Sequence, residues 1–210
     1  MTRIILVRHG ETEYNTAQIF RGRKDISLNK TGHRQAKLLG QHFKKMCFEA
    51  IYSSPLKRSF ETANHIANYH RIDVVKSNNL IDLDYGKWEG LTDNQVQYTY
   101  PLLYDKWITQ PQLVIMPDGE ALGDIKKRTV TLLHETLEKH SGTILLVSHR
   151  VVLKILICYM RGLKISDFWD VRIDLGSFTI FERQGNQFVL NCHNNVSHLD
   201  MSNPTTEVDF

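Results

Sequence analysis

The stretch Ile4-Ile5-Leu6-Val7-Arg8-His9-Gly10 joins a short apolar run directly to an arginine and a histidine. The same arrangement occurs twice more, because residues 50–53 lead to Lys57-Arg58 and residues 143–148 lead to His149-Arg150. A short apolar run of this kind is typical of a strand that is buried on both faces. Since the carboxyl ends of parallel strands lie at one edge of a sheet, we expect the three basic clusters to meet there.

Helical repeats separate the three runs. Apolar residues recur at spacings of three and four over residues 36–46 and again over residues 60–67. Ser54 and Pro55 are interpreted as the N-cap and the first residue of the second of these helices, and a later helix is expected over residues 118–140. Alternating strands and helices predict an α/β fold of three layers, α/β/α, in which helices cover both faces of a mostly parallel sheet.

Two further segments complete the predicted architecture. Residues 178–182 and 187–192 flank a turn and are expected to form a hairpin that adds an antiparallel edge to the sheet. Residues 82–120 are rich in tyrosine and tryptophan, and we interpret them as a helical cap inserted over the sheet edge, which also packs a small core of its own. We therefore expect one domain over residues 1–210, with the cap as an insertion within it.

Length and charge narrow the classes of function. A chain of 210 residues can bury about 70% of its unfolded surface around one core. Its formal net charge is only +3, and the basic residues are scattered, which favours a mixed solvated surface over a nucleic-acid site. The apolar runs are shorter than the roughly 20 residues that cross a bilayer, and no secretory signal is apparent. We expect a cytoplasmic protein without a membrane or nucleic-acid partner.

The three cysteines point to neither a disulfide framework nor a metal site. Cys47, Cys158 and Cys192 are far apart in the sequence, and no Cys-x-x-Cys occurs. We interpret them as buried thiols and expect no metal ligands among them.

The placement of charge predicts an anionic ligand. Lys57 and Arg58 lie in the first turn of their predicted helix, where the positive end of the helix dipole disfavours each cation by roughly 0.3–1 kcal/mol. A phosphate bound at Arg58 would reverse this penalty, because helix N-termini and guanidinium groups both favour anions.

Two histidines and two arginines at one pocket can perform phosphoryl transfer without a metal. A neutral imidazole is a competent nucleophile at pH 7, and the cations can bind the oxygens of the transferring group. A carboxylic acid is still needed to protonate the leaving alcohol and later to activate water, and each role contributes roughly 10²- to 10⁴-fold in rate.

Four segments, in order, resemble the histidine phosphatase superfamily of cofactor-dependent phosphoglycerate mutases and related phosphatases. The signature is similar to residues 6–15, and its second-arginine helix is similar to residues 53–63. The cap entry is similar to Gly86-Lys87-Trp88-Glu89-Gly90, and the second-histidine strand to Val147-Ser148-His149. A segment from Gly22 to Ala36 also looks like the family, so the resemblance spans almost the whole chain.

The resemblance implies a role for each matching position. His9 is the implied nucleophile, Arg8, Arg58 and His149 bind the phosphoryl group, and Asn15 adds a hydrogen bond. Gly22 belongs to the matching segment and is counted with the substrate-binding residues. The resemblance implies neither a metal nor an organic cofactor.

The acid position departs from the family's pattern. Members typically carry Leu-x-Glu shortly before the cap entry, whereas this chain has Leu80-Ile81-Asp82. We expect Asp82 to be the acid and base, with Asp84 and Glu89 as alternatives. Aspartate is one methylene shorter and has a lower reference pKa than glutamate. Arg150 is a second departure, since many members have glycine there; it either recognises substrate or pairs with a neighbour.

The compact cap favours a phosphatase over a mutase, because a mutase must exclude water while its intermediate re-orients. The overall pattern is most similar to the metal-independent phosphoserine phosphatases of the superfamily, which implies serine biosynthesis, and next to broad-specificity or alpha-ribazole phosphatases. The expected substrate is a small phosphorylated metabolite with a carboxylate, which His198 and Arg21 would hold. A non-catalytic phosphate-binding scaffold is the alternative from another class. The sequence allows a homodimer without fixing it.

Overall fold

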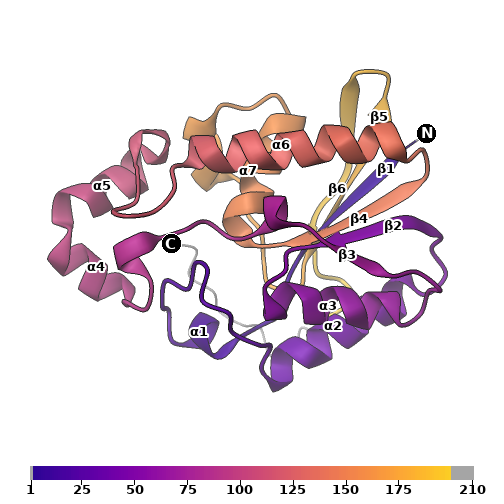
Figure 1. Ribbon diagram of the computed structural model, residues 1–210, viewed down its shortest axis with the longest axis horizontal. Helices are drawn as coiled ribbons and strands as arrows, with labels where there is room; N and C mark the ends of the chain where they lie inside the picture. Colours follow the sequence, from indigo (N-terminus) through magenta and orange to yellow (C-terminus); the bar gives the residue numbers. More distant parts are fainter. Residues whose placement is uncertain (1, 200–210) are drawn as a thin grey trace.

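Six strands form one mixed sheet at the centre of the molecule (Figure 1). In the computed structural model, which describes residues 2–199, the strands follow the order β3-β2-β4-β1-β5-β6 across the sheet. The first four strands along the chain run parallel, whereas β5 and β6 form an antiparallel edge, as predicted. The bounds are β1 (Arg3–Arg8), β2 (Phe48–Ser53), β3 (Val74–Lys76), β4 (Thr143–Ser148), β5 (Phe178–Gln184) and β6 (Gln187–Asn195).

Helices cover both faces of the sheet, which confirms the predicted three-layer α/β/α arrangement (Figure 1). Helices α2 and α3 lie on one face, and α6 and α7 lie on the other. The bounds are α1 (Glu13–Thr16), α2 (Lys30–Phe43), α3 (Lys57–Ala67), α4 (Asp93–Thr99), α5 (Pro101–Thr109), α6 (Leu122–Lys139) and α7 (Arg150–Met160). Four 3-10 turns complete the described elements: η1 (Asn78–Leu80), η2 (Gly86–Trp88), η3 (Pro111–Leu113) and η4 (Ile165–Asp170).

Alternate side chains of the central strands divide the core into two clusters. Ile5 and Val7 of β1 pack with α2 and α3, whereas Ile4 and Leu6 pack with α6 and α7. All four side chains are at most 1% exposed. Burial of each such side chain contributes roughly 1.5–3 kcal/mol, so the register of β1 is strongly determined. This register fixes the position at which His9 leaves the sheet.

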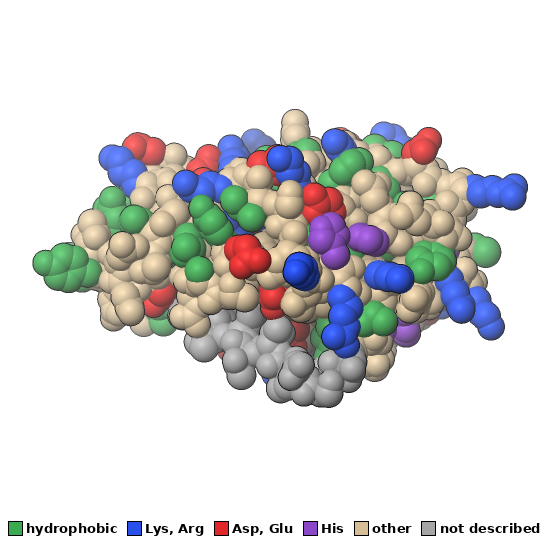
Figure 2. Space-filling view, turned by 90° about the horizontal axis from the view of Figure 1, so that it is seen from below, with side chains coloured by type: hydrophobic (Ala, Val, Ile, Leu, Met, Phe, Trp, Pro, Cys, Tyr) green, Lys and Arg blue, Asp and Glu red, His purple; other side chains and the backbone are tan. Residues whose placement is uncertain are grey.

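The segment 82–120 contains η2, α4, α5 and η3, and α4 and α5 project from the end of the molecule at the left of Figure 1. Trp88 and Trp107 are buried within it, so the segment has an apolar core of its own that joins the core of α6 and α7. Hydrophobic side chains are also exposed at this end (Figure 2), where Tyr98 is 90% and Leu102 is 82% exposed. Its role as a lid stays a prediction.

The helix starts predicted at Pro55, with Ser54 as its N-cap, and at Asp118 were wrong. Helix α3 begins at Lys57, whose backbone N–H donates to Asp25 Oδ1 at 2.7 Å, whereas the Ser54 hydroxyl accepts from the N–H of Leu56 at 3.3 Å and lies 2.8 Å from His149 Nε2. Helix α6 begins at Leu122, because Asp118 has a φ of 58° and lies in a turn. In both cases contacts between distant segments or a tight turn override the local cap pattern.

The cysteine prediction holds for one of three residues. Cys158 is buried, but Cys192 is only partly buried and Cys47, which lies beyond the end of α2, is exposed. The thiol of Cys47 therefore contacts solvent rather than the core.

The described surface carries both signs of charge. On the face shown in Figure 2, Lys and Arg side chains are interspersed with Asp and Glu. Among residues 2–199, none of the helices combines the length and the apolar character that crossing a bilayer requires.

Candidate active site

The ends of three parallel strands bring the predicted site residues together. His9 follows β1, Arg58 lies in the first turn of the helix after β2, and His149 precedes α7 directly after β4. The backbone N–H of His9 donates to the carbonyl of Ser148 at 3.1 Å, which extends the pairing of β1 and β4 into the site. The ring centroids of His9 and His149 are 5.2 Å apart. The three basic clusters therefore meet as predicted, except that Lys57 points outward to Asp25.

One ring nitrogen of His9, the predicted nucleophile, keeps its lone pair. Its Nδ1 lies 2.7 Å from the carbonyl oxygen of Gly10, which can only accept, so Nδ1 carries the proton and Nε2 carries the lone pair. The ring is fully buried, and within the described part of the chain no group hydrogen-bonds Nε2. Burial, followed by the charges of Arg58, Arg21 and Arg8, holds the pKa of His9 well below its ordinary value. The ring is therefore neutral at pH 7.

Arg58 is fully buried, and its guanidinium makes four hydrogen bonds. Its Nη1 donates to the carbonyl of Lys24 at 2.8 Å and its Nη2 to the carbonyl of Gly22 at 2.7 Å. Nη2 also donates to Asp82 Oδ2 at 3.0 Å, and Nε donates to His149 Nδ1 at 3.2 Å. The guanidinium is thus held in one orientation and connects the second histidine to the predicted acid.

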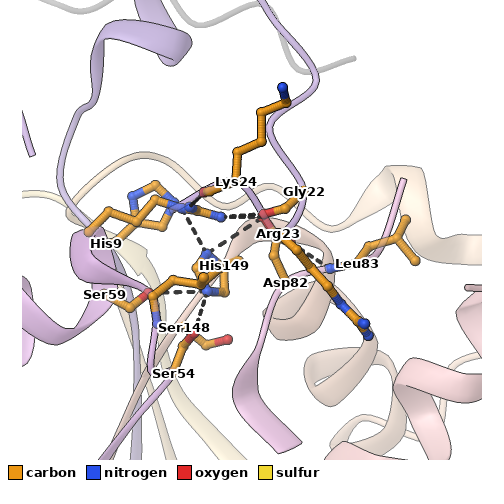
Figure 3. Close-up of polar contacts among 12 residues, drawn as sticks. His9, Gly22, Arg23, Lys24, Ser54, Ser59, Asp82, Leu83, Ser148 and His149 are labelled. Atoms are coloured by element: carbon orange, nitrogen blue, oxygen red, sulfur yellow. Dashed lines mark hydrogen bonds and ion pairs between the residues drawn. The ribbon is translucent and has the colours of Figure 1, made fainter. Parts of the chain in front are cut away.

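The contacts of His149 fix its tautomer. Because Nδ1 accepts from Arg58, the proton is on Nε2, which lies 2.8 Å from Ser54 Oγ and 3.3 Å from Ser59 Oγ. Figure 3 shows His149 between these two serines and Asp82. Burial, followed by the charges of Arg58 and His9, keeps the pKa of His149 well below its ordinary value. His149 is therefore also neutral in this structure.

Asp82 lies inside the site and is 5% exposed. Its Oδ2 contacts Arg58 and lies 3.6 Å from His149 Nδ1, and its Oδ1 accepts from the N–H of Leu83 at 2.9 Å. From α6, Arg128 donates to the carbonyl of Asp82 at 3.1 Å and holds this segment against the sheet. The carboxylate predicted as the acid is therefore next to Arg58 and His149, two of the residues predicted to bind the phosphoryl group.

The two alternative acids have other contacts. Asp84 Oδ2 forms an ion pair with Arg23 Nη1 at 3.1 Å. Glu89 Oε1 accepts from the N–H of Arg23 at 2.7 Å, and burial raises the pKa of Glu89. Of the three carboxylates, only Asp82 lies beside His149, so the geometry favours Asp82.

Arg8, Asn15 and Gly22 support the same centre. Arg8 is 1% exposed, and its Nη1 donates to the carbonyl of Ile173 at 2.7 Å. The side-chain oxygen of Asn15 accepts from the N–H and hydroxyl of Thr12 at 3.0 and 2.8 Å, which orders the loop after His9. Gly22 has a φ of 47°, which favours glycine, and its carbonyl anchors Arg58.

The other residues predicted to bind substrate, Arg21, Arg150 and His198, do not all have the same surroundings. Arg21 is half-buried, and its charge lowers the pKa of both His9 and His149. Arg150 hydrogen-bonds the hydroxyl of Tyr85. His198 packs instead against His42 and Phe178, with ring centroids 5.5 Å from each, and burial followed by His42 lowers its pKa to about 4.

A neutral buried imidazole surrounded by guanidinium groups suits the transfer of a phosphoryl group from a phosphate ester dianion. The sequence profile of the histidine phosphatase superfamily (branch 1) matches residues 4–196. The chain belongs to this superfamily. It is therefore a phosphatase of the histidine phosphatase kind. Within residues 2–199, no group of three or more His, Cys, Asp or Glu is arranged to hold a metal ion.

Several relatives of this histidine phosphatase match over nearly their full length. Phosphoserine phosphatase 1 of Hydrogenobacter thermophilus is 34% identical over 200 residues, which cover 95% of each chain. Among solved structures, YhfR of Bacillus stearothermophilus has a TM-score of 0.90 at 29% identity and covers 94% of this chain and 99% of its own. A mutant phosphoserine phosphatase of Entamoeba histolytica in complex with phosphoserine has a TM-score of 0.84 at 28% identity, covering 95% and 100%.

Sequence reasoning missed several residues of this histidine phosphatase site. Ser54 was interpreted as a helix cap and Ser59 was not singled out, although both hydroxyls contact His149. Tyr85 was interpreted only as a cap aromatic, and Arg128 was not considered. The two serines lie within the recognised segment 53–63, so their position beside Arg58 was an available signal; the contacts of Tyr85 and Arg128 depend on tertiary structure.

Proposed function

We propose that this histidine phosphatase is a metal-independent phosphomonoesterase that hydrolyses phosphoserine through a phosphohistidine on His9. The observation that carries the proposal is the buried Nε2 of His9, which keeps its lone pair while Gly10 holds the other ring nitrogen. Metal independence rests on charge, because the buried guanidinium groups of Arg8 and Arg58 can stabilise the phosphoryl oxygens in place of a metal ion. The phosphoserine phosphatases among the relatives support the substrate.

In the first step, Arg8, Arg58 and His149 hold the phosphoryl group, and Asn15 contributes a hydrogen bond. His9 Nε2 forms a bond to phosphorus as the ester bond breaks, and the protonated Asp82 gives its proton to the departing serine oxygen. The substrate dianion would then lie against Arg58, the residue that Asp82 also contacts.

In the second step, the Asp82 carboxylate takes a proton from water while the water oxygen attacks phosphorus. The bond between phosphorus and His9 Nε2 breaks, and inorganic phosphate leaves. Asp82 is again protonated and His9 is again neutral, so protons and charge balance over the cycle. Arg21, Arg150 and His198 are the candidates for binding the carboxylate of the substrate.

The proposal extends to the setting of the reaction. Hydrolysis of phosphoserine yields serine, so a role in serine biosynthesis and the cytoplasmic location expected from the sequence belong to the same proposal. The small phosphorylated metabolite is then the partner of this protein.

Steady-state turnover of phosphoserine in excess EDTA tests this function. We expect hydrolysis to persist in the chelator, to disappear in His9→Ala, and to remain in His134→Ala, a surface histidine whose ring contacts Tyr159. Loss of turnover in EDTA would refute metal independence.

A substrate panel with 3-phosphoglycerate, alpha-ribazole phosphate and nitrophenyl phosphate decides the substrate. A higher kcat/KM for one of these esters than for phosphoserine would refute the assignment of phosphoserine as the substrate.

A further inference from the structure

We propose that Arg150 is the specificity-determining residue, which binds the carboxylate of the leaving group, and that Tyr85 and Trp169 are positioning residues that hold its guanidinium. This inference rests on the proposed function and deepens it, because it assigns the recognition of the carboxylate to one side chain. The assignment depends on three observations, which concern the place of Arg150, its contact with Tyr85 and its stacking on Trp169.

Arg150 lies beside the reacting centre by virtue of its place in the chain. It is the first residue of α7 and follows His149 directly. A cation in the first turn of a helix is disfavoured by the helix dipole, so a role in stabilising α7 does not explain an arginine there. A bound carboxylate removes that penalty, because it brings negative charge to the positive end of the helix.

The contact with Tyr85 places Arg150 on the side of the leaving group. Tyr85 is 5% exposed and follows Asp82, the proposed proton donor, by three residues. Its hydroxyl hydrogen-bonds Arg150. The charge of Asp82 raises the pKa of this hydroxyl, and the charge of Arg21 lowers it. The proton donor, the tyrosine and the two arginines therefore surround one region next to His149.

Trp169 restricts the guanidinium from another element. The guanidinium carbon of Arg150 lies 6.0 Å from the centroid of the Trp169 ring, within the range of a cation–π contact. The indole N–H of Trp169 donates to the carbonyl of Trp107 at 2.9 Å, which fixes the ring against the cap helix α5. Arg150 is thus held by the cap entry at Tyr85 and by η4 at Trp169.

The chemistry of phosphoserine fits this arrangement. Its carboxylate lies only a few bonds from the ester oxygen, so a substrate with phosphorus at His9 and its ester oxygen at Asp82 brings the carboxylate toward Tyr85 and Arg150. A guanidinium binds a carboxylate through two parallel N–H···O bonds, which an ammonium cannot reproduce. The ring of His198, by contrast, packs on His42 and Phe178.

The test compares phosphoserine with phosphoethanolamine, which keeps the phosphate and the ammonium but lacks the carboxylate. The quantity measured is the ratio of kcat/KM for the two esters. We expect Arg150→Gln to lower this ratio at least tenfold, and Arg150→Lys to lower it less, because lysine keeps the charge but loses the paired geometry. Tyr85→Phe should lower the ratio roughly threefold through a higher KM for phosphoserine, because the loss of one hydrogen bond frees the guanidinium. Arg161→Gln, at the other end of α7, is the matched control and should leave the ratio unchanged.

An unchanged ratio in Arg150→Gln would overturn the assignment, as would an equal loss of both esters in Arg150→Gln and Arg150→Lys, which would place Arg150 in the chemical step. The wild-type protein alone decides the proposed function. If it prefers 3-phosphoglycerate to phosphoserine, the substrate assignment fails, and the same variants then test Arg150 on that carboxylate.

Discussion

At the scale of single residues, the site is built from two neutral histidines that share one arginine. Arg58 donates to the ring of His149 and to the carboxylate of Asp82, while its charge helps to keep His9 unprotonated. The same buried guanidinium therefore orients His149 and Asp82 and acts on His9 through its charge. The shorter side chain of Asp82, where the family typically has glutamate, still reaches the centre because Leu83 and Arg128 hold its segment close.

Asp82→Asn should lower kcat for phosphoserine at least a hundredfold, because an amide can neither give a proton to the leaving oxygen nor take one from water. Asp82→Glu restores the longer carboxylic acid and should keep more activity than Asp82→Asn. Stopped assays of phosphate release measure both. Near-wild-type turnover in Asp82→Asn would transfer the role to another carboxylate, of which the half-buried Glu89 is the first to examine.

The buried neutral histidines also predict how stability depends on pH. The pKa values of His9 and His149 are well below the ordinary value in the folded protein. As the pH falls through about 6.5, the unfolded chain takes up protons at these positions and the native state does not, so stability falls. We expect the free energy of unfolding to decrease from pH 7 to pH 5.

His9→Gln and His149→Gln should each lose less stability over that interval than the wild-type protein, because one buried titrating ring is absent. Urea unfolding at pH 7, 6 and 5 measures the difference, with His134→Gln as the exposed control. Equal pH dependence in all four proteins would contradict the assignment of both rings as buried and neutral.

At the scale of elements, the site depends on parallel strands that end together. β4 lies between β2 and β1, and its alternating side chains face the two core clusters. Leu145 is fully buried and packs on the side of α2 and α3. Any shift of β4 along its neighbours would move His149 away from His9, so packing of this strand supports both stability and geometry.

Leu145→Ala should lower the free energy of unfolding by about 2–5 kcal/mol, because it removes buried contacts and leaves a cavity. Val189→Ala in the edge strand β6, where the side chain is 38% exposed, should cost less than about 1 kcal/mol. Chemical denaturation measures both variants. Similar losses at the two positions would contradict the central place of β4 in the core.

The elements also show how far the sequence predicts this protein. The central strands and the meeting of His9, Arg58 and His149 follow from apolar runs that end in basic residues. The start of α3 does not, because its cap comes from Asp25 in a distant loop and not from the adjacent Ser54. The contact of Tyr85 with Arg150 also escapes prediction, since it joins the cap entry to the start of α7.

At the scale of the whole molecule, the proposed reaction needs residues that lie far apart in the chain. The proposed nucleophile lies near residue 10, the proposed acid at the entry to the segment 82–120, and the second histidine near residue 150. The fold brings His9, Asp82 and His149 together at the carboxyl edge of one sheet (Figure 3). The segment 82–120 contributes Asp82, and the helices α3 and α7 begin at this edge. Covalent labelling of the intact protein therefore reports on the complete arrangement.

The most direct test of the phosphohistidine is to trap it. The protein is mixed with phosphoserine, quenched in alkali within a turnover, digested with trypsin and analysed by mass spectrometry. Cleavage after Arg8 and Arg21 releases a peptide, residues 9–21, whose only histidine is His9. We predict that this peptide carries one phosphoryl group on the imidazole. Efficient turnover without any label on His9, or with the label on another residue, would contradict the account.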